Sequence, residues 1–352
     1  AAVLSIPFCK FVIEILLYQN SKASCSIIIA ERMGVMSVKE FILKELEKNR
    51  DQFLSGEELA QKAQVTRAAV WKAMKELKEE GYKIESKRKT GYRLLLENDL
   101  ISPQGISSYL KQDLKKLDIF SYKTIDSTNE EGKRLLGSTK GPFLVVSEEQ
   151  TKGKGRLGRP FYSPSETGIY MTLVYPFLED VEMALRLTTM TSVAAAKSIE
   201  KLTGLPVGIK WVNDLYLRNK KIAGILTEGI TSLESGRIET VIIGIGINIR
   251  TEDFPEDIKD SADSIHSKDL IRNQLIAEIV NEFYHLIEDS SDYLDYYRAH
   301  HILQGKEIYY LYRGEKKYGK VLGVSDKGEL ILDQEGKTIQ ISSGEVTVRP
   351  LK

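Results

Sequence analysis

The sequence is poor in the residues that bind transition metals or form disulfides. Its 352 residues include two cysteines, Cys9 and Cys25, and four histidines, at 266, 285, 300 and 301. The histidines show no spacing that builds a metal site with acidic neighbours, so we expect neither zinc nor catalytic thiol chemistry. Without a disulfide framework the chain suits a reducing compartment, and we expect it in the cytoplasm.

Neither sign of charge is in excess, and no long apolar run is present. Fifty basic residues balance fifty acidic ones, so no global field draws the chain to nucleic acid or membrane. Residues 11–18 are apolar but short and broken by Glu14, which excludes a membrane span there. We expect residues 1–35, which lack periodicity and precede Met36, to be a disordered extension without function.

Three short helices are predicted after Met36, within residues 36–99. The first carries its apolar residues on one face: Val38, Phe41, Ile42 and Leu46. Ser55 and Glu58 form a capping box for a second helix that ends near residue 63. Thr66 can cap a third helix, which runs to about residue 80. This spacing is that of a helix-turn-helix.

The third helix and the segment after it are basic. Apolar residues recur on one helix face at 70, 73, 74 and 77, and residues 82–96 alternate as a hairpin with three cations near its tip. A solvated lysine-rich face is the alternative, but the complete order of helices and wing favours DNA binding. The candidate DNA-binding residues are Thr66, Arg67, Trp71, Lys72, Lys87, Arg88 and Lys89.

The region from Pro103 to His301 alternates strand-like and helix-like stretches, which indicates an α+β domain with a mixed sheet backed by helices. A helix is expected over residues 182–202. Strands are expected over residues 144–147, 169–174, 207–217, 222–228 and 238–249.

A glycine-rich basic loop spans Gln150–Arg159. Its three glycines allow close backbone approach and its four cations favour a polyanion. The loop lacks the Gly-Lys-Ser/Thr ending of a P-loop, so a nucleotide-binding P-loop is not supported. A flexible surface linker is the alternative.

Three further polar segments are candidate ligand sites. Lys210–Asp214 is placed inside an apolar strand, where a lysine needs either a bound anion or an internal partner such as Asp214 or Glu228. Asp126–Asn129 ends a strand with short polar side chains that suit a small neutral ligand or form an ordinary turn. Gly244–Asn248 places two glycines on a strand, for ligand approach or for strand packing.

Together and in this order these segments resemble the biotin protein ligase family. The resemblance covers about residues 38–350 and includes Lys221–Leu226 as a further motif. The preceding winged helix resembles the bifunctional, repressor-type members. The sequence departs from the family pattern at Lys154, where arginine is common, and at Val212, where proline is usual; lysine lacks the bidentate fork of arginine.

The resemblance implies a role for each matching residue. Biotin would be bound by Ser127, Thr128, Asn129, Gln150, Lys154, Gly155, Arg156 and Lys210. ATP would be bound by Arg156, Arg159, Lys210 and Asn248. The catalytic residues would be Lys210, Arg156 and Arg159. No side chain has the setting of an activated nucleophile, and no transition-metal site is implied.

The resemblance also implies the reaction, the partners and the domains. Biotin and ATP, with Mg²⁺, would give biotinyl-adenylate, and biotin would pass to the carrier protein domain of acetyl-CoA carboxylase or of other biotin-dependent carboxylases. The adenylate would induce a homodimer that represses biotin genes at operator DNA, with no membrane partner. The expected domains are a winged helix (36–99), a catalytic domain (100–301) and an SH3-like β-barrel (302–352).

Two alternative functions are also considered for this sequence. A lipoate-protein ligase shares the catalytic fold, although the winged helix and the Gly-basic loop argue against it. A transcription regulator whose former catalytic domain only senses a vitamin is the other alternative. The retained basic loop and Lys210 argue against that function.

Overall fold

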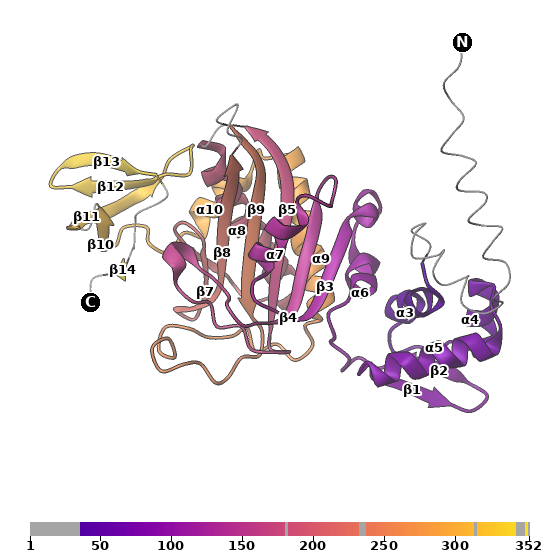
Figure 1. The fold of residues 1–352 in the computed structure, drawn as a ribbon. Coiled ribbons are helices and arrows are strands. Elements are labelled where there is room, and N and C mark those ends of the chain that lie inside the picture. Colours follow the sequence, from indigo (N-terminus) through magenta and orange to yellow (C-terminus); the bar gives the residue numbers. More distant parts are fainter. Residues whose placement is uncertain (1–35, 180–181, 232–236, 313–314, 343–348, 351–352) are drawn as a thin grey trace, which may run out of the picture. The chain divides into compact units, whose positions relative to one another are not determined.

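The computed structural model describes residues 36–179, 182–231, 237–312, 315–342 and 349–350, drawn in colour in Figure 1. The chain divides into two compact units, residues 1–98 and 99–352. The extension expected over residues 1–35 lies outside the described residues. Within the described part of the chain, no helix is long and apolar enough to cross a membrane.

The N-terminal unit contains the three predicted helices and the predicted hairpin. Ser37, Ser55 and Thr66 each accept a hydrogen bond from a backbone N–H of the helix that follows, so the turns between helices are set by local capping. Apolar side chains from all three helices and the hairpin form one small core. The elements are α3 (Val38–Lys48), α4 (Gly56–Ala63), α5 (Arg67–Glu79), β1 (Ile84–Lys87) and β2 (Gly91–Leu94).

The second unit is built on a seven-stranded mixed sheet in the order β3-β4-β5-β9-β8-β7-β6. Strands β3 and β4 are parallel, and every other neighbouring pair in this sheet is antiparallel. The strands are β3 (Asp118–Ile125), β4 (Phe143–Gln150), β5 (Gly168–Glu179), β6 (Gly208–Lys210), β7 (Asp214–Leu217), β8 (Lys220–Thr231) and β9 (Ile238–Asn248).

Helices cover both faces of this sheet (Figure 1). Alternate residues of β4 point to opposite faces, so Leu144 and Val146 join the main core while Phe143 and Val145 join a smaller one. Helix α7 covers the smaller core, and the longer helices lie on the other face. The helices are α6 (Pro103–Tyr109), α7 (Thr128–Leu135), α8 (Glu182–Thr203), α9 (Arg272–Glu288) and α10 (Tyr293–Ala299), with 3-10 turns η1 (Gln112–Lys116) and η2 (Arg156–Gly158).

The single strand predicted over residues 207–217 is wrong, and so is the placement of Lys210–Asp214 inside it. The chain forms a tight hairpin in which Lys210 ends β6, residues 211–213 turn, and Asp214 begins β7 opposite Lys210. The apolar pattern did not reveal the turn because Trp211 and Val212 are themselves buried. Lys210 is therefore presented at a turn.

A second, five-stranded antiparallel sheet in the order β13-β12-β11-β10-β14 forms the C-terminal part of this unit. It confirms the small all-β fold that the resemblance implies for the C-terminal residues. Its strands are β10 (Glu307–Tyr312), β11 (Glu315–Val324), β12 (Leu330–Gln334), β13 (Lys337–Ile341) and β14 (Arg349–Pro350).

Candidate active site and nucleic-acid interface

The start of α7 and the end of β4 form a buried polar cluster. Because β3 and β4 are parallel, their carboxyl ends lie at the same edge of the sheet, with Ile125 opposite Gln150. Thr128, the first residue of α7, donates from both its backbone N and its Oγ1 to Gln150 Oε1, at 2.9 and 3.1 Å. Gln150 in turn donates to Ser163 Oγ at 3.0 Å. Ser127 and Thr128 are buried, so their polar atoms are held away from bulk water.

Asn129 occupies the centre of this cluster. Its Nδ2 donates to Glu228 Oε2 at 2.7 Å, and its Oδ1 lies 2.7 Å from the Thr172 hydroxyl. A Cβ on Gly244 would lie 2.2 Å from the same Oδ1. The glycine in β9 is thus needed for strand β9 and helix α7 to approach closely, and Asn129 is fixed from three strands.

The sheet register aligns further site residues in a row beside this cluster. Residues directly opposite one another in antiparallel strands point to the same face. Pairing connects Lys210 to Asp214, Asp214 to Gly224, and Gly224 to Gly246. This row lies one pleat away from Gly244 on the face that α7 covers. Gly246 leaves room for the Phe161 ring and Gly224 for the Lys221 side chain, since a Cβ at either glycine would lie 2.4 or 3.1 Å from those atoms.

The Gly-basic loop folds back on itself above this face. Gly155 N donates to Arg159 O at 2.7 Å, which closes a turn around η2. Lys154 pairs with Glu130 of α7 at 2.9 Å. Leu157 has a left-handed backbone conformation, with φ 57°, and a side chain that is 71% exposed. The loop is therefore tied at its base, while its tip presents an apolar side chain to solvent.

Arg156 and Lys210 converge on the turn at residues 211–213. Arg156 Nη1 donates to Asn213 Oδ1 at 3.4 Å. Burial lowers the pKa of the Arg156 guanidinium from its ordinary value; Asp214 opposes this shift and Arg159 adds to it. The half-buried Lys210 ammonium lies 5.6 Å from the centre of the Tyr216 ring. Partly desolvated cations of this kind interact strongly with an anionic ligand.

The two carboxylates considered as internal partners of Lys210 each form an ion pair with another lysine as well. Asp214 pairs with Lys221 at 2.6 Å, and Glu228 pairs with Lys133 at 2.8 Å. Asn248 is buried at the end of β9, where its Nδ2 donates to Asp263 O. The structure thus brings Thr128, Asn129 and Gln150 together, places Arg156 beside the turn that follows Lys210, and leaves Asn248 in a separate backbone contact.

Two residues that support the cluster were missed as site residues by sequence reasoning. Thr172 is the one threonine in the apolar run of β5, which has no serine, and that isolated small polar side chain was the available signal. Glu228 appeared only as a possible partner of Lys210. Neither could be linked to Asn129, because the contacts depend on the pairing of strands distant in sequence.

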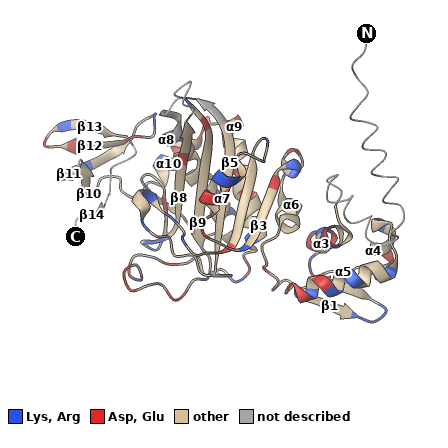
Figure 2. Cartoon of the chain, in the orientation of Figure 1, with Lys and Arg blue, Asp and Glu red and all other residues tan. Residues whose placement is uncertain are grey.

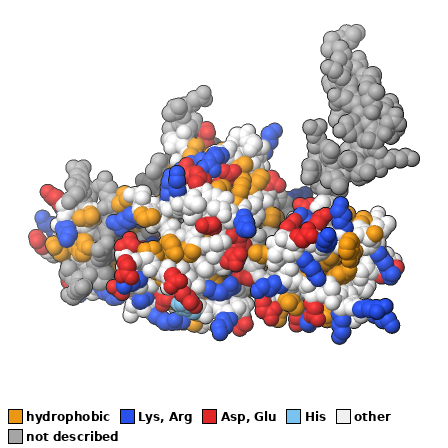
Figure 3. Space-filling model, turned by 60° about the horizontal axis from the view of Figure 1, so that its bottom comes forward, with side chains coloured by type: hydrophobic (Ala, Val, Ile, Leu, Met, Phe, Trp, Pro, Cys, Tyr) orange, Lys and Arg blue, Asp and Glu red, His pale blue; other side chains and the backbone are white. Residues whose placement is uncertain are grey.

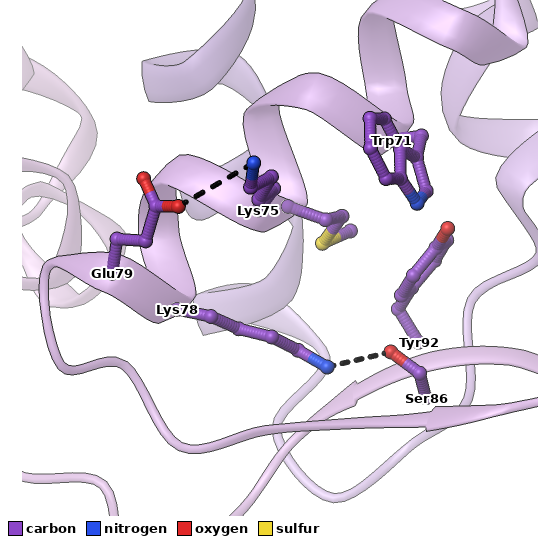
Figure 4. A pocket seen from close by; sticks show the side chains of 7 residues that line it. Trp71, Lys75, Lys78, Glu79, Ser86 and Tyr92 are labelled. Carbon is purple, nitrogen blue, oxygen red and sulfur yellow. Dashed lines mark hydrogen bonds and ion pairs between the residues drawn. The ribbon is translucent and has the colours of Figure 1, made fainter.

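The exposed face of α5 and the hairpin of the N-terminal unit form the candidate nucleic-acid interface (Figure 4). A hollow of about 310 Å³ lies between them, lined in part by Trp71 and Tyr92. Lys78 crosses from the helix to Ser86 of the hairpin at 2.8 Å, and Trp71 is 61% exposed. All seven candidate DNA-binding residues are exposed: Thr66, Arg67, Trp71, Lys72, Lys87, Arg88 and Lys89.

The basic side chains of the N-terminal unit gather on helix α5 and at the hairpin (Figure 2). The helix cations have acidic neighbours, since Arg67 pairs with Glu57 and Lys72 with Glu76. Acidic and basic side chains are also mixed over the face seen in Figure 3, in keeping with the balanced composition. Over residues 36–98, Lys87, Arg88 and Lys89 at the hairpin tip are the one run of three consecutive cations.

Comparison with known protein families finds a match for three regions of the chain. Residues 38–93 match an HTH domain, residues 121–248 match the Biotin/lipoate A/B protein ligase family, and residues 304–349 match the Biotin protein ligase C terminal domain. The fold and the polar cluster thus define a protein ligase of the biotin and lipoate class joined to a helix-turn-helix.

Proteins that match most of the length of this chain show which kind of protein ligase it is. The chain is 32% identical to the bifunctional ligase/repressor BirA of Bacillus spizizenii, over 84% of this chain and 94% of that protein. It is 27% identical to BirA of Escherichia coli, over 85% of this chain and 94% of that protein. The biotin protein ligase of Aquifex aeolicus, solved with biotin and ATP, superposes with a TM-score of 0.57 at 28% identity, covering 66% of this chain and 99% of that chain. The chain belongs to the bifunctional ligase/repressor family of biotin protein ligases.

Proposed function

We propose that the α7 face of the sheet activates biotin with ATP, and that the residues assigned from the sequence perform this step. The observation that supports it is the fixed polar cluster around Asn129, next to the desolvated Arg156 and the turn that carries Lys210. Thr128, Asn129 and Gln150 supply hydrogen-bond groups for a neutral polar ring. Two cations at the other end suit a carboxylate and a phosphate.

In the first step the biotin carboxylate attacks the α-phosphorus of ATP. A carboxyl C–O–P bond forms, the bond from the α-phosphorus to the pyrophosphate oxygen breaks, and pyrophosphate leaves. Both reactants are anions, so Arg156, Arg159 and Lys210 offset their repulsion and stabilise charge on the phosphoryl oxygens. Mg²⁺ that enters with ATP would add to this neutralisation.

In the second step a carrier-domain lysine amine attacks the activated acyl carbon. An amide bond forms, the acyl C–O bond breaks, AMP leaves, and the amine proton passes to solvent. The enzyme contributes orientation and exclusion of water. The acceptor we propose is the biotin carrier domain of acetyl-CoA carboxylase or of a related carboxylase, and the reaction takes place in the cytoplasm.

The N-terminal unit is proposed to repress biotin genes by binding operator DNA. Thr66, Arg67, Trp71 and Lys72 lie at the start of α5, which would enter the major groove. The hairpin tip, with Lys87, Arg88 and Lys89, would contact phosphates. Biotinyl-adenylate would favour a homodimer, so the reaction intermediate would also control DNA binding.

The experiment that tests the ligase function is biotin-dependent release of pyrophosphate from ATP, followed by labelling of an added carrier domain. Lipoate in place of biotin, with a lipoyl carrier, is the matched control. Turnover with biotin alone supports the proposal, and turnover with lipoate alone supports a lipoate ligase. Biotin binding without pyrophosphate release supports a vitamin-sensing regulator.

A further inference from the structure

The turn at residues 211–213 contacts the C-terminal sheet through Trp211. The indole is buried, with 4% of its surface exposed, and its Nε1 donates to the carbonyl of Gly328 at 2.9 Å. Gly328 lies in the turn between β11 and β12, 117 residues further along the chain. This hydrogen bond joins the residue after Lys210 to the C-terminal sheet.

The strand that precedes the turn depends on the C-terminal segment as well. Strand β6 has three residues and lies at the edge of the large sheet. On its open edge, Ile209 N donates to His300 O at 2.8 Å and Ile302 N donates to Ile209 O at 3.0 Å. The linker to the C-terminal sheet thus pairs with β6 at the residue before Lys210.

The other two residues of the turn are anchored to separate parts of the unit. Val212 O accepts hydrogen bonds from the Tyr297 hydroxyl at 3.2 Å and the Ser192 hydroxyl at 3.4 Å. Asn213 Nδ2 donates to Ile225 O at 2.6 Å, while its Oδ1 accepts from Arg156. Lys210 and Arg156 therefore share one turn, and Trp211 is the residue of that turn that reaches the C-terminal sheet.

The Gly328 carbonyl is itself held in place. Ser325 Oγ accepts hydrogen bonds from the backbone N of Lys327 and of Glu329, and Ser325 O accepts one from Gly328 N. Arg298 of α10 donates from Nε to Val324 O at 2.9 Å. The β11–β12 turn is thus a preformed acceptor for the indole, docked against helix α10.

We propose that Trp211 is a positioning residue for adenylation: its hydrogen bond to Gly328 fixes the turn that sets Lys210 and Arg156 in place. A charged group that offsets transition-state charge must be held within a fraction of an ångström, and a three-residue edge strand has few bonds of its own to do so. The C-terminal sheet therefore contributes to the first half-reaction through the hydrogen bond between the Trp211 indole and the Gly328 carbonyl. This inference rests on the proposed role of Lys210.

The test is Trp211→Phe, which keeps an aromatic ring in the buried site and removes the N–H donor. Biotin-dependent pyrophosphate release should show kcat reduced about tenfold, with KM for biotin changed less, because Lys210 acts mainly in the transition state. In a Lys210→Ala background the same substitution should reduce kcat by clearly less than tenfold, because only its effect through Arg156 remains. A purely structural defect would reduce kcat equally in both backgrounds.

A second variant and a control variant, both of which leave Trp211 unchanged, test the inference in case Trp211→Phe impairs folding. Ser325→Ala loosens the turn that presents Gly328 O and should reduce kcat in the same direction. Gln304→Leu removes a different side-chain bond to the C-terminal sheet, from Gln304 Nε2 to Leu322 O, and should leave kcat unchanged. Wild-type kcat in Trp211→Phe, or an equal loss in Gln304→Leu, would overturn the inference. Absence of pyrophosphate release by the unsubstituted chain would instead overturn the proposed function.

Discussion

Replacement of Gly244 by alanine is expected to displace Asn129 and thereby to weaken both folding and biotin binding. The new Cβ would lie 2.2 Å from Asn129 Oδ1, and contacts below 3.0 Å do not occur without a shift. The backbone at Gly244 is not left-handed, so alanine itself adds no strain. Asn129 must then move and lose its bonds to Thr172 and Glu228, each 2.7 Å long.

The expected magnitude follows from those two bonds. A neutral bond contributes about 1 kcal/mol and a bond to a charged group about 2 kcal/mol, so the free energy of unfolding should fall by about 2–3 kcal/mol. Urea unfolding followed by circular dichroism measures this change. Biotin affinity, measured by calorimetry without ATP, should fall at least about tenfold if Asn129 is a ligand.

Two further variants decide whether the clash is the cause. Asn129→Ala combined with Gly244→Ala should be no less stable than Asn129→Ala alone, because the clashing side chain is gone. For Gly229→Ala on strand β8, the three atoms nearest to the new Cβ belong to the Ile238 side chain, at 3.2–3.5 Å, so this variant should change stability by less than about 0.5 kcal/mol. Unchanged stability and biotin affinity in the Gly244 variant would refute the reasoning.

Three other predictions concern separate parts of the molecule. Burial lowers the pKa of His301 to about 4 from the usual 6.5. As the pH falls, the unfolded state is therefore protonated before the folded state. The free energy of unfolding keeps its full value above about pH 6.5 and falls by about 3 kcal/mol toward pH 4. Unfolding at several pH values, with His301→Phe as the comparison, measures this loss. Alanine at Lys87, Arg88 and Lys89 together should reduce the slope of log DNA affinity against log salt by about 2–3, measured by fluorescence anisotropy. Lys210→Ala should reduce pyrophosphate release about a hundredfold.

Each of these predictions has a result that contradicts it. The histidine reasoning is wrong if His301→Phe loses stability between pH 6.5 and 4 as steeply as the unsubstituted chain. An unchanged salt slope in the triple variant means that the hairpin tip does not contact phosphates. Near-normal pyrophosphate release by Lys210→Ala, in a protein whose melting temperature is unchanged, refutes the role given to that lysine.

The sequence by itself determined the parts whose signals are local. Caps at Ser55 and Thr66 and the apolar spacing of α5 specify the helix-turn-helix, because capping bonds and helix faces involve residues within a few positions of each other. Composition and short motifs likewise identified the Gly-basic loop and the polar residues that begin α7. These features were predicted within a few residues of their observed bounds.

The tertiary structure decided which of these residues meet. The hairpin at Lys210 was hidden because its turn is as apolar as the strands on either side. The contacts of Asn129 with Thr172 and Glu228 depend on the register of β5, β9 and β8. The bond from Trp211 to Gly328 spans 117 residues. No local pattern encodes such contacts, because strand register and domain docking are fixed only when the whole core packs.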